Sequence, residues 1–161
     1  MSPESRKLAS AHPTRKQEYS SISSIRSRYG KSIRRASAET GLSEQLILAV
    51  LIVESDGNPS AVSPTGCRGL MQLLTSTAIQ YGVPRSRIFD PDANIRGGAR
   101  VLADYLHRYA HGDLDRALAS YNRGPNAVAR LMRDEGFDPS SYPYVVRVKK
   151  ILRFLELKQE R

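Results

Sequence analysis

The chain has 161 residues, of which 40% are hydrophobic and 25% charged, a composition that is typical of a globular domain and excludes a wholly disordered chain. A single cysteine excludes an internal disulfide framework and a multi-cysteine zinc site. The longest apolar run, Leu46 to Val53, is too short to span a bilayer. The net charge of +9 suggests an anionic partner such as nucleic acid, acidic lipid or cell-wall polymer.

The positive charge is concentrated at the two ends of the chain. Residues 1–35 hold nine basic and two acidic side chains, and residues 147–161 hold six basic and two acidic ones. The segment between them, 36–146, has ten arginines against twelve acidic residues. This middle segment has no basic stripe with interleaved aromatic residues, so we expect no nucleic-acid binding. We expect the basic ends to attract an anionic wall, membrane surface or partner.

Residues 1–20 are rich in Ser, Pro, Lys and Arg and nearly free of large aliphatic side chains. This composition predicts a flexible basic tail, followed by one domain over residues 21–161. The tail also lacks the apolar segment of a secretory signal peptide, so the sequence leaves the export route open.

The first two helices are predicted from hydrophobic spacing. Apolar residues recur at three- and four-residue steps from Ile22 to Ala36, and Gly41 ends that run. Ser43 is expected to cap a second helix that carries an apolar face and ends at residues 57–59.

The rest of the domain is also expected to be helical. Helices are predicted over residues 75–81, from about 92 to 109, from 113 to 121 and near the C-terminus, where Val145, Val148, Leu152 and Leu155 face inward. Residues 60–74 are too rich in Gly, Pro and Ser for a long helix and leave room for at most a small β-hairpin. The predicted fold class is therefore mainly α.

Glu54 is the residue that points most directly to chemistry. It follows Leu51, Val50 and Ile47 by three, four and seven positions, so a helix places it on their apolar face. Burial disfavours a carboxylate, and we expect the Glu54 pKa to lie well above the usual value of about 4.3. An acid that stays protonated near neutral pH can protonate a leaving sugar oxygen. On helix position alone, a glutamate that reaches into water is the favoured interpretation.

Four sequence blocks change that balance. They are residues 54–72, with Glu-Ser, Asn-Pro and Ser-Pro-Thr-Gly-Cys-Arg-Gly-Leu-Met-Gln; residues 94–98; residues 119–125, Ala-Ser-Tyr-Asn-Arg-Gly-Pro; and residues 144–148. In this order and spacing they resemble the soluble lytic transglycosylase family, the SLT domain of glycoside hydrolase family 23. The resemblance covers the chain from about Ile22 to Leu155 and implies a lysozyme-like, mainly helical fold.

The resemblance implies an enzyme that cleaves the MurNAc-β-1,4-GlcNAc bond of peptidoglycan. Glu54 matches the single catalytic acid/base, which protonates the departing GlcNAc O4. It then accepts the proton of the muramic acid C6 hydroxyl, which attacks C1 and leaves a 1,6-anhydroMurNAc end. A two-carboxylate hydrolase would need a second acid across the bond. Asp56 would point away from Glu54 on a helix, and neither Asp90 nor Asp92 lies in a matching segment.

The same resemblance suggests substrate-binding residues. Tyr121 aligns with the tyrosine that approaches the catalytic glutamate, and its phenol can donate a hydrogen bond to a carboxylate. Gln72 and Ser63 match polar residues that contact sugar groups, Met71 matches an apolar residue that lines the cleft, and Gly69 would allow close backbone approach. The alternatives are a core tyrosine, turn chemistry at Ser63 and Gly69, and a core methionine.

The chain departs from the family pattern at three places. Cys67 stands where a small residue is usual, and Leu73-Leu74-Thr75 replaces the usual Met-Pro after the glutamine. Ser140-Ser141 replaces a common Glu-Thr, whose glutamate lines the cleft in many relatives. The occupied subsites are therefore left open, although none of these changes affects Glu54.

No metal or cofactor is expected. His107 and His111 are four residues apart on a predicted helix, but no third ligand is near in sequence. The resemblance places the protein in the periplasm or cell envelope, with peptidoglycan glycan strands as its substrate. A small domain of this kind suggests, by analogy, a cell-envelope secretion or phage machine as partner. The alternatives left open are a goose-type lysozyme-like hydrolase and a non-catalytic glycan-binding module.

Overall fold

The computed structural model describes the backbone of residues 15–159 and the side chains of residues 21–159. Helix α1 (Arg15–Thr40) begins at Arg15, before the Ile22 start that the hydrophobic spacing predicts. The last part of the expected 1–20 tail therefore belongs to a helix, and residues 1–14 lie outside the described residues.

The fold is mainly α, as predicted, and has a single domain. After α1 come α2 (Glu44–Ser55), α3 (Thr75–Gln80), the short helix η2 (Arg85–Arg87), α4 (Pro91–Asp104), the π-turn η3 (Tyr105–Tyr109), α5 (Leu114–Arg123), α6 (Pro125–Glu135), the short helix η4 (Pro139–Ser141) and α7 (Pro143–Gln159). The expected hairpin region contains two isolated antiparallel bridges, Val62 with Arg68 and Arg68 with Leu73. Within residues 15–159 there is no β-strand beyond these two bridges.

Local sequence signals set the helix ends. The Ser43 side chain caps α2 by accepting a hydrogen bond from the Leu46 N–H at 3.1 Å. Asp113 caps α5 in the same way, by accepting from the Arg116 N–H at 3.0 Å. Helix α4 begins at Pro91 behind the cap Asp90, so the predicted start near residue 92 is correct to within a residue.

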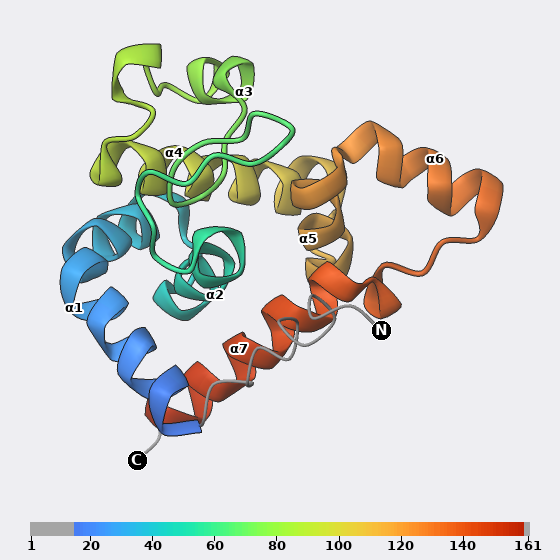
Figure 1. Ribbon diagram of the computed structural model, residues 1–161. Coiled ribbons are helices and arrows are strands. Elements are labelled where there is room, and N and C mark those ends of the chain that lie inside the picture. Colours follow the sequence, from blue (N-terminus) through green and yellow to red (C-terminus); the bar gives the residue numbers. More distant parts are fainter. Residues whose placement is uncertain (1–14, 160–161) are drawn as a thin grey trace, which may run out of the picture.

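Helix α2 is the centre of the core. Figure 1 shows it enclosed by α1, α4 and α7, and its side chains Ile47, Val50 and Leu51 have no exposed surface. Its C-terminal end is fixed from α1, where the buried Tyr29 hydroxyl donates to the Gly57 carbonyl at 3.2 Å. This end carries Glu54, so packing of the core also positions the candidate acid.

The loop between α2 and α3 is bound to α4 by the buried side chain of Asn94, which has no exposed surface. Its Nδ2 donates to the carbonyls of Ile88, at 2.7 Å, and Arg68, at 3.1 Å. Its Oδ1 accepts from the Met71 N–H at 2.7 Å. The Asn94 side chain thus satisfies two backbone groups of this loop and the Ile88 carbonyl that precedes α4.

Two elements differ from the sequence-based expectation. Helix α6 follows the Gly124-Pro125 break directly, because proline is compatible with the first turn of a helix. It lies beside α5 at the edge of the molecule (Figure 1). The predicted 92–109 helix changes to π geometry at Tyr105–Tyr109. In the described part of the chain, no helix combines the length and apolar character needed to cross a membrane.

Candidate active site

Glu54 lies in the last turn of α2 on the buried face that the sequence predicts. The residue is half-buried. Its Oε1 accepts a hydrogen bond of 2.6 Å from the hydroxyl of Tyr144, which lies in the first turn of α7 and is 8% exposed. The packing of α7 against α2 thus brings a neutral donor to the carboxyl group across a large separation in sequence.

The environment of Glu54 favours its protonated form. Burial raises the Glu54 pKa from 4.5 to about 7, while the Tyr144 hydrogen bond and the positive charge of Arg147 act in the opposite direction. A carboxyl group with this pKa exists in both protonation states near neutral pH. It can therefore donate a proton in one step and accept one in the next.

The other carboxylates named by the sequence have different surroundings. Asp56 is exposed in a left-handed turn just beyond α2. Asp90 caps α4 and pairs with Arg87 at 3.1 Å, and Asp92 accepts from Ser32 at 2.8 Å. Among the described residues, the one charged group that shifts the Glu54 pKa is a cation.

Tyr121 does not form the hydrogen bond that the sequence suggested. Its hydroxyl donates to the Met71 carbonyl at 2.7 Å, and the donor to Glu54 is Tyr144. Tyr121 is nevertheless close to the acid. Burial and the negative charge of Glu54 raise the Tyr121 pKa well above its usual value, so this phenol stays neutral. Tyr121 holds the loop carbonyl beside the site.

The polar side chains proposed to contact sugar are partly engaged within the loop. Gln72 has a left-handed backbone, and its Nε2 donates to the carbonyls of Gly69, at 2.9 Å, and Ala61, at 3.2 Å. The Ser63 hydroxyl accepts from the Cys67 N–H at 3.0 Å and lies 3.0 Å from the Thr65 hydroxyl. Both side chains therefore stabilise the loop, which agrees with the turn interpretation of Ser63.

Met71 and Gly69 also belong to the framework of the site. Met71 has no exposed surface and packs against Gly98 of α4, where a Cβ atom would lie 2.5 Å from the Met71 Cβ. Gly69 is buried with a φ of +78°, and a Cβ there would lie 2.9 Å from the Ile88 carbonyl oxygen and would contact the Asn94 amide. The structure supports the core and turn interpretations of these two residues.

The departures from the family pattern have local structural consequences. Cys67 is half-buried, and its Sγ lies 3.8 Å from the Thr65 hydroxyl. Leu74 is 44% exposed and precedes α3 without a side-chain cap. The Ser140 hydroxyl donates to Asp138 at 2.8 Å in η4. Position 140 thus holds a neutral side chain, as the sequence indicates.

Sequence reasoning did not assign roles to Tyr144 and Arg147. Tyr144 belongs to the Tyr-Val block and lies four residues before the inward-facing Val148. This spacing indicates that Tyr144 lies on the buried face of α7. Arg147 lies one turn after Tyr144 and is exposed. Its proximity to Glu54 depends on the packing of α7 on α2, which the sequence pattern does not report.

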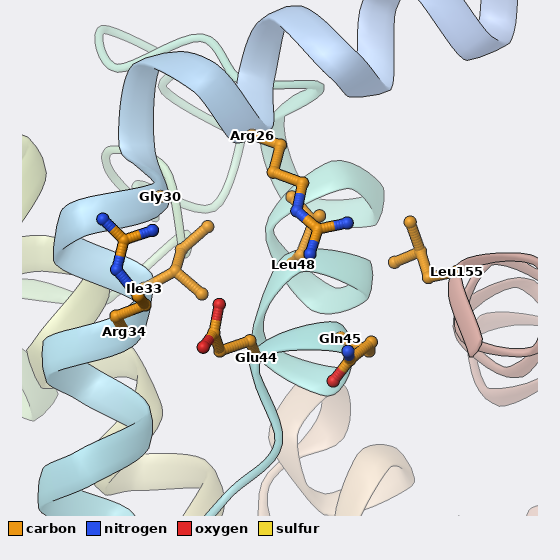
Figure 2. Close-up of a pocket in the computed structure, with 8 residues that line it drawn as sticks. All are labelled: Arg26, Gly30, Ile33, Arg34, Glu44, Gln45, Leu48 and Leu155. Carbon is orange, nitrogen blue, oxygen red and sulfur yellow. The ribbon is translucent and has the colours of Figure 1, made fainter. Parts of the chain in front are cut away.

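A pocket lies at the opposite end of α2 (Figure 2). It is lined by residues of α1, α2 and α7, namely Arg26, Gly30, Ile33, Arg34, Glu44, Gln45, Leu48 and Leu155. Glu44 begins α2 and Glu54 lies in its last turn, so this pocket is separate from the candidate active site.

The histidines do not form a metal site in the described part of the chain. His107 lies in the π-helix η3, but His111 follows the end of that helix and has a left-handed backbone. The expectation that both lie on one helix is therefore wrong. Within residues 21–159, no three His, Cys, Asp or Glu side chains are grouped in a way that could hold a metal ion.

Comparison with known proteins places the chain in a family. The model of the transglycosylase SLT domain matches residues 31–141. A transglycosylase of Enterobacteria phage PRD1 is 40% identical over 113 residues, which are 70% of this chain and 39% of the relative. The membrane-bound lytic murein transglycosylase F 2 of Alkalilimnicola ehrlichii is 42% identical over 133 residues, 78% of this chain and 29% of the relative.

The X-ray structure of an inactive mutant of the lytic transglycosylase Slt from Pseudomonas aeruginosa matches with a TM-score of 0.71 and 27% identity. The match covers 82% of this chain and 24% of that chain. The chain thus spans well under half the length of each of these relatives. Because the family model covers most of the chain and agrees with the fold, the chain belongs to the transglycosylase SLT domain family.

Proposed function

We propose that the protein is a peptidoglycan lytic transglycosylase that cleaves the MurNAc-β-1,4-GlcNAc bond and forms a 1,6-anhydroMurNAc end. The observation that carries this proposal is the single half-buried carboxyl group of Glu54, with a pKa of about 7 and a neutral donor at 2.6 Å. The names of the relatives support the reaction class, since they are a transglycosylase and lytic murein transglycosylases.

Glu54 acts first as an acid and then as a base. The protonated carboxyl gives its proton to the glycosidic oxygen, so the GlcNAc leaving group departs as an alcohol. The resulting carboxylate takes the proton from the C6 hydroxyl of MurNAc while that oxygen forms a bond to C1. The reaction consumes no water, and Glu54 returns to its protonated form.

The surroundings of Glu54 fit this alternation of charge. Tyr144 fixes the orientation of the carboxyl group and stabilises the carboxylate that forms after the first step, because its hydroxyl donates to Oε1. Arg147 lowers the energy of the same carboxylate through its positive charge. Burial opposes both effects and keeps the starting acid protonated.

The second candidate is hydrolysis by the same acid, as in goose-type lysozymes. Water would replace the C6 hydroxyl as the nucleophile, and the product would have a reducing MurNAc end. The surroundings of Asp56, which is exposed, and of Asp90 and Asp92, which are engaged at α4, favour the intramolecular reaction, since an inverting hydrolase uses a second carboxylate to activate its water. A non-catalytic glycan-binding module would not require an acid with a raised pKa.

The proposed location is the periplasm or cell envelope, where peptidoglycan is found. The similarity to a membrane-bound lytic murein transglycosylase supports an envelope location. The relative from phage PRD1 supports a phage or secretion machine as the assembly in which the protein acts.

Mass spectrometry of the products tests the reaction. Digestion of purified peptidoglycan should release muropeptides that are lighter by one water than hydrolysed ones. The Glu54→Gln variant should lose activity by at least about a thousandfold, because it removes the acid and the base together. Glu156→Gln is the matched control, since Glu156 is an exposed glutamate on α7. Reducing MurNAc ends from the wild type, or full activity of Glu54→Gln, would contradict the proposal.

A further inference from the structure

The outer face of α7 carries a stripe of exposed side chains that the candidate active site does not use. Val146, Lys150, Arg153 and Leu157 follow one another at four-, three- and four-residue steps, so these four residues, the outer stripe, share one side of the helix. Val146 is 50% exposed and Leu157 is 56% exposed. Two cations therefore lie between two exposed aliphatic side chains, over a length of about 16 Å.

The outer stripe lies on the opposite side of α7 from the candidate acid. Tyr144, Val148 and Leu155 form the buried side of the helix, which packs against α2. Val146 comes two residues after Tyr144 and therefore starts about 200° around the helix from it. Figure 1 shows α7 along the lower edge of the molecule. A partner on the outer stripe thus leaves the hydrogen bond between Tyr144 and Glu54 uncovered.

The two cations of the outer stripe are available to an anionic partner. Among the described residues, no carboxylate lies within ion-pair distance of Lys150 or Arg153, whereas the neighbouring Lys149 pairs with Asp115 of α5 at 2.8 Å. Residues 147–161 hold six basic and two acidic side chains. The end of the chain is therefore net positive, and two of its cations lie in the outer stripe.

The mixture of residue types favours a membrane surface over other anionic partners. A soluble polyanion pairs with the cations but leaves Val146 and Leu157 in water, so their burial contributes nothing. An acidic protein needs a contiguous apolar centre at its interface, whereas cations separate the two apolar side chains here. A lipid interface accepts aliphatic side chains at the acyl boundary and cations at the phosphates, along a helix that lies in its plane.

We propose that the outer stripe of α7 docks the protein on a membrane surface that contains anionic phospholipids. Val146 and Leu157 enter the boundary between headgroups and acyl chains, and Lys150 and Arg153 contact lipid phosphates. Glu54 then lies on the side of α7 that faces away from the lipid. The docking does not depend on the reaction at Glu54.

A tryptophan reporter tests the contact directly, because the chain contains no tryptophan. In Leu157→Trp, vesicles of phosphatidylglycerol and phosphatidylcholine in equal parts should shift the indole emission to shorter wavelength at physiological salt. Vesicles of phosphatidylcholine alone should cause little shift, since they lack the anionic charge. Ile79→Trp is the matched control, because Ile79 on α3 is also 56% exposed, and its emission should not move.

Flotation with the same anionic vesicles separates the two parts of the outer stripe. The double variant Lys150→Gln with Arg153→Gln should bind about thirtyfold more weakly than the wild type, or roughly fivefold for each cation. The double variant Val146→Ser with Leu157→Ser keeps the charge and should bind about tenfold more weakly. Both double variants should cleave soluble glycan at the wild-type rate, because their substitutions lie outside the candidate active site.

The double variant Arg28→Gln with Lys31→Gln is the matched control for charge. Arg28 and Lys31 are exposed cations of α1, so this variant removes the same charge from a different helix. At physiological salt, charges beyond about 8 Å of a surface are largely screened. The control should therefore bind the anionic vesicles nearly as well as the wild type.

Each contrary result has a distinct meaning. An equal loss of vesicle binding in the α1 control would overturn the outer stripe in favour of general attraction by a basic protein. Unchanged binding after loss of the two apolar side chains would overturn the membrane in favour of an anionic polymer. An emission shift for Ile79→Trp and not for Leu157→Trp would move the contact to α3. Failure of the proposed function would appear separately, as a wild-type protein that binds vesicles but forms no anhydro ends.

Discussion

The two main helix contacts shift carboxyl pKa values in opposite directions: the α2–α7 contact raises one and the α1–α4 contact lowers one. At the first, Glu54 has a neutral phenol as its hydrogen-bond donor, and burial raises its pKa to about 7. At the second, Glu39 accepts from two arginines of α4, Arg96 and Arg100, and the Arg96 hydrogen bond is the main cause of its lowered pKa. Burial without a paired cation gives a group that can move protons, whereas paired guanidinium groups give one that stays charged.

Asp92 shows that a carboxyl pKa at the α1–α4 contact is lowered even where burial opposes it. Burial by itself would raise the Asp92 pKa, but hydrogen bonds from Ser32 and Arg96 outweigh it and lower the pKa. The α1–α4 contact therefore stabilises the frame by charge compensation. Near Glu54, by contrast, the cation is not close enough to form an ion pair, and the carboxyl group remains titratable near neutral pH.

The largest expected effect comes from placing a charge where this frame holds a neutral group. Asn94→Asp replaces the Nδ2 donor with an oxygen that faces the carbonyls of Ile88 and Arg68. We expect a loss of about 3 kcal/mol in the free energy of unfolding at pH 7, measured by urea denaturation. The loss should shrink at pH 5, because protonation of the new acid restores one donor and removes the charge.

Asp92→Asn is the control for this substitution, two residues earlier on α4. It removes a charge from a half-exposed network, and its cost should be about 1 kcal/mol. Equal costs for the two variants would contradict the distinction between a buried neutral site and a compensated charged one.

The second prediction concerns the neutral donor of the acid. Tyr144→Phe removes the hydrogen bond that favours the Glu54 carboxylate, so the Glu54 pKa should rise above about 7 and the alkaline limb of the kcat/KM profile should move to higher pH. The maximal rate should fall by about ten- to a hundredfold, since the carboxylate loses its fixed orientation.

Tyr121→Phe separates the two tyrosines. The Tyr121 hydroxyl donates to the Met71 carbonyl and not to Glu54, so its loss should destabilise the loop by about 1 kcal/mol without moving the pH limb. A pH limb that moves with Tyr121→Phe and not with Tyr144→Phe would return the role of carboxylate donor to Tyr121.

The sequence predicted the features that depend on local pattern. The predicted helices, the cap Ser43 and the buried face that carries Glu54 follow from spacing and residue type. The sequence also predicted that the Glu54 pKa is raised, because its position after Leu51 and Val50 places the carboxyl group on the apolar face. These inferences need neighbours within about two helical turns.

The features that were missed depend on contacts between distant segments. Tyr144 and Glu54 are separated by 90 positions, and only the packing of α7 on α2 brings them together. Gln72 and Ser63 also form hydrogen bonds within the loop, which a motif does not report, and their contact with sugar stays a prediction. Helix α6 was missed because Gly124-Pro125 ends one helix and begins the next.

The third prediction uses the raised pKa of Glu54. The folded-state pKa of Glu54 is raised from 4.5 to about 7, so ionisation of Glu54 costs stability as the pH rises through that window. Glu54→Gln cannot ionise, so at pH 8 it should be more stable than the wild type. Its free energy of unfolding should be higher by about 1 to 3 kcal/mol. At pH 4 the two proteins should be nearly equal. Urea denaturation at the two pH values measures the difference, and a destabilised Glu54→Gln at pH 8 would contradict it.

The smallest expected effect belongs to Glu39, and its sign is opposite. The Glu39 pKa is lowered, so its ion pairs contribute stability above the ordinary pKa of 4.5, and that contribution is lost as the pH falls through the folded-state pKa. Glu39→Gln should therefore cost stability at pH 8, by about 0.5 to 1 kcal/mol because Glu39, Arg96 and Arg100 are all about one-third exposed. Salt screens exposed pairs, so most of this cost should disappear in 1 M NaCl, whereas the gain from Glu54→Gln reflects burial and should persist. Urea denaturation with and without salt measures both. If the cost of Glu39→Gln were insensitive to salt, packing rather than charge compensation would hold α1 against α4, and the contrast with Glu54 would then be one of burial alone.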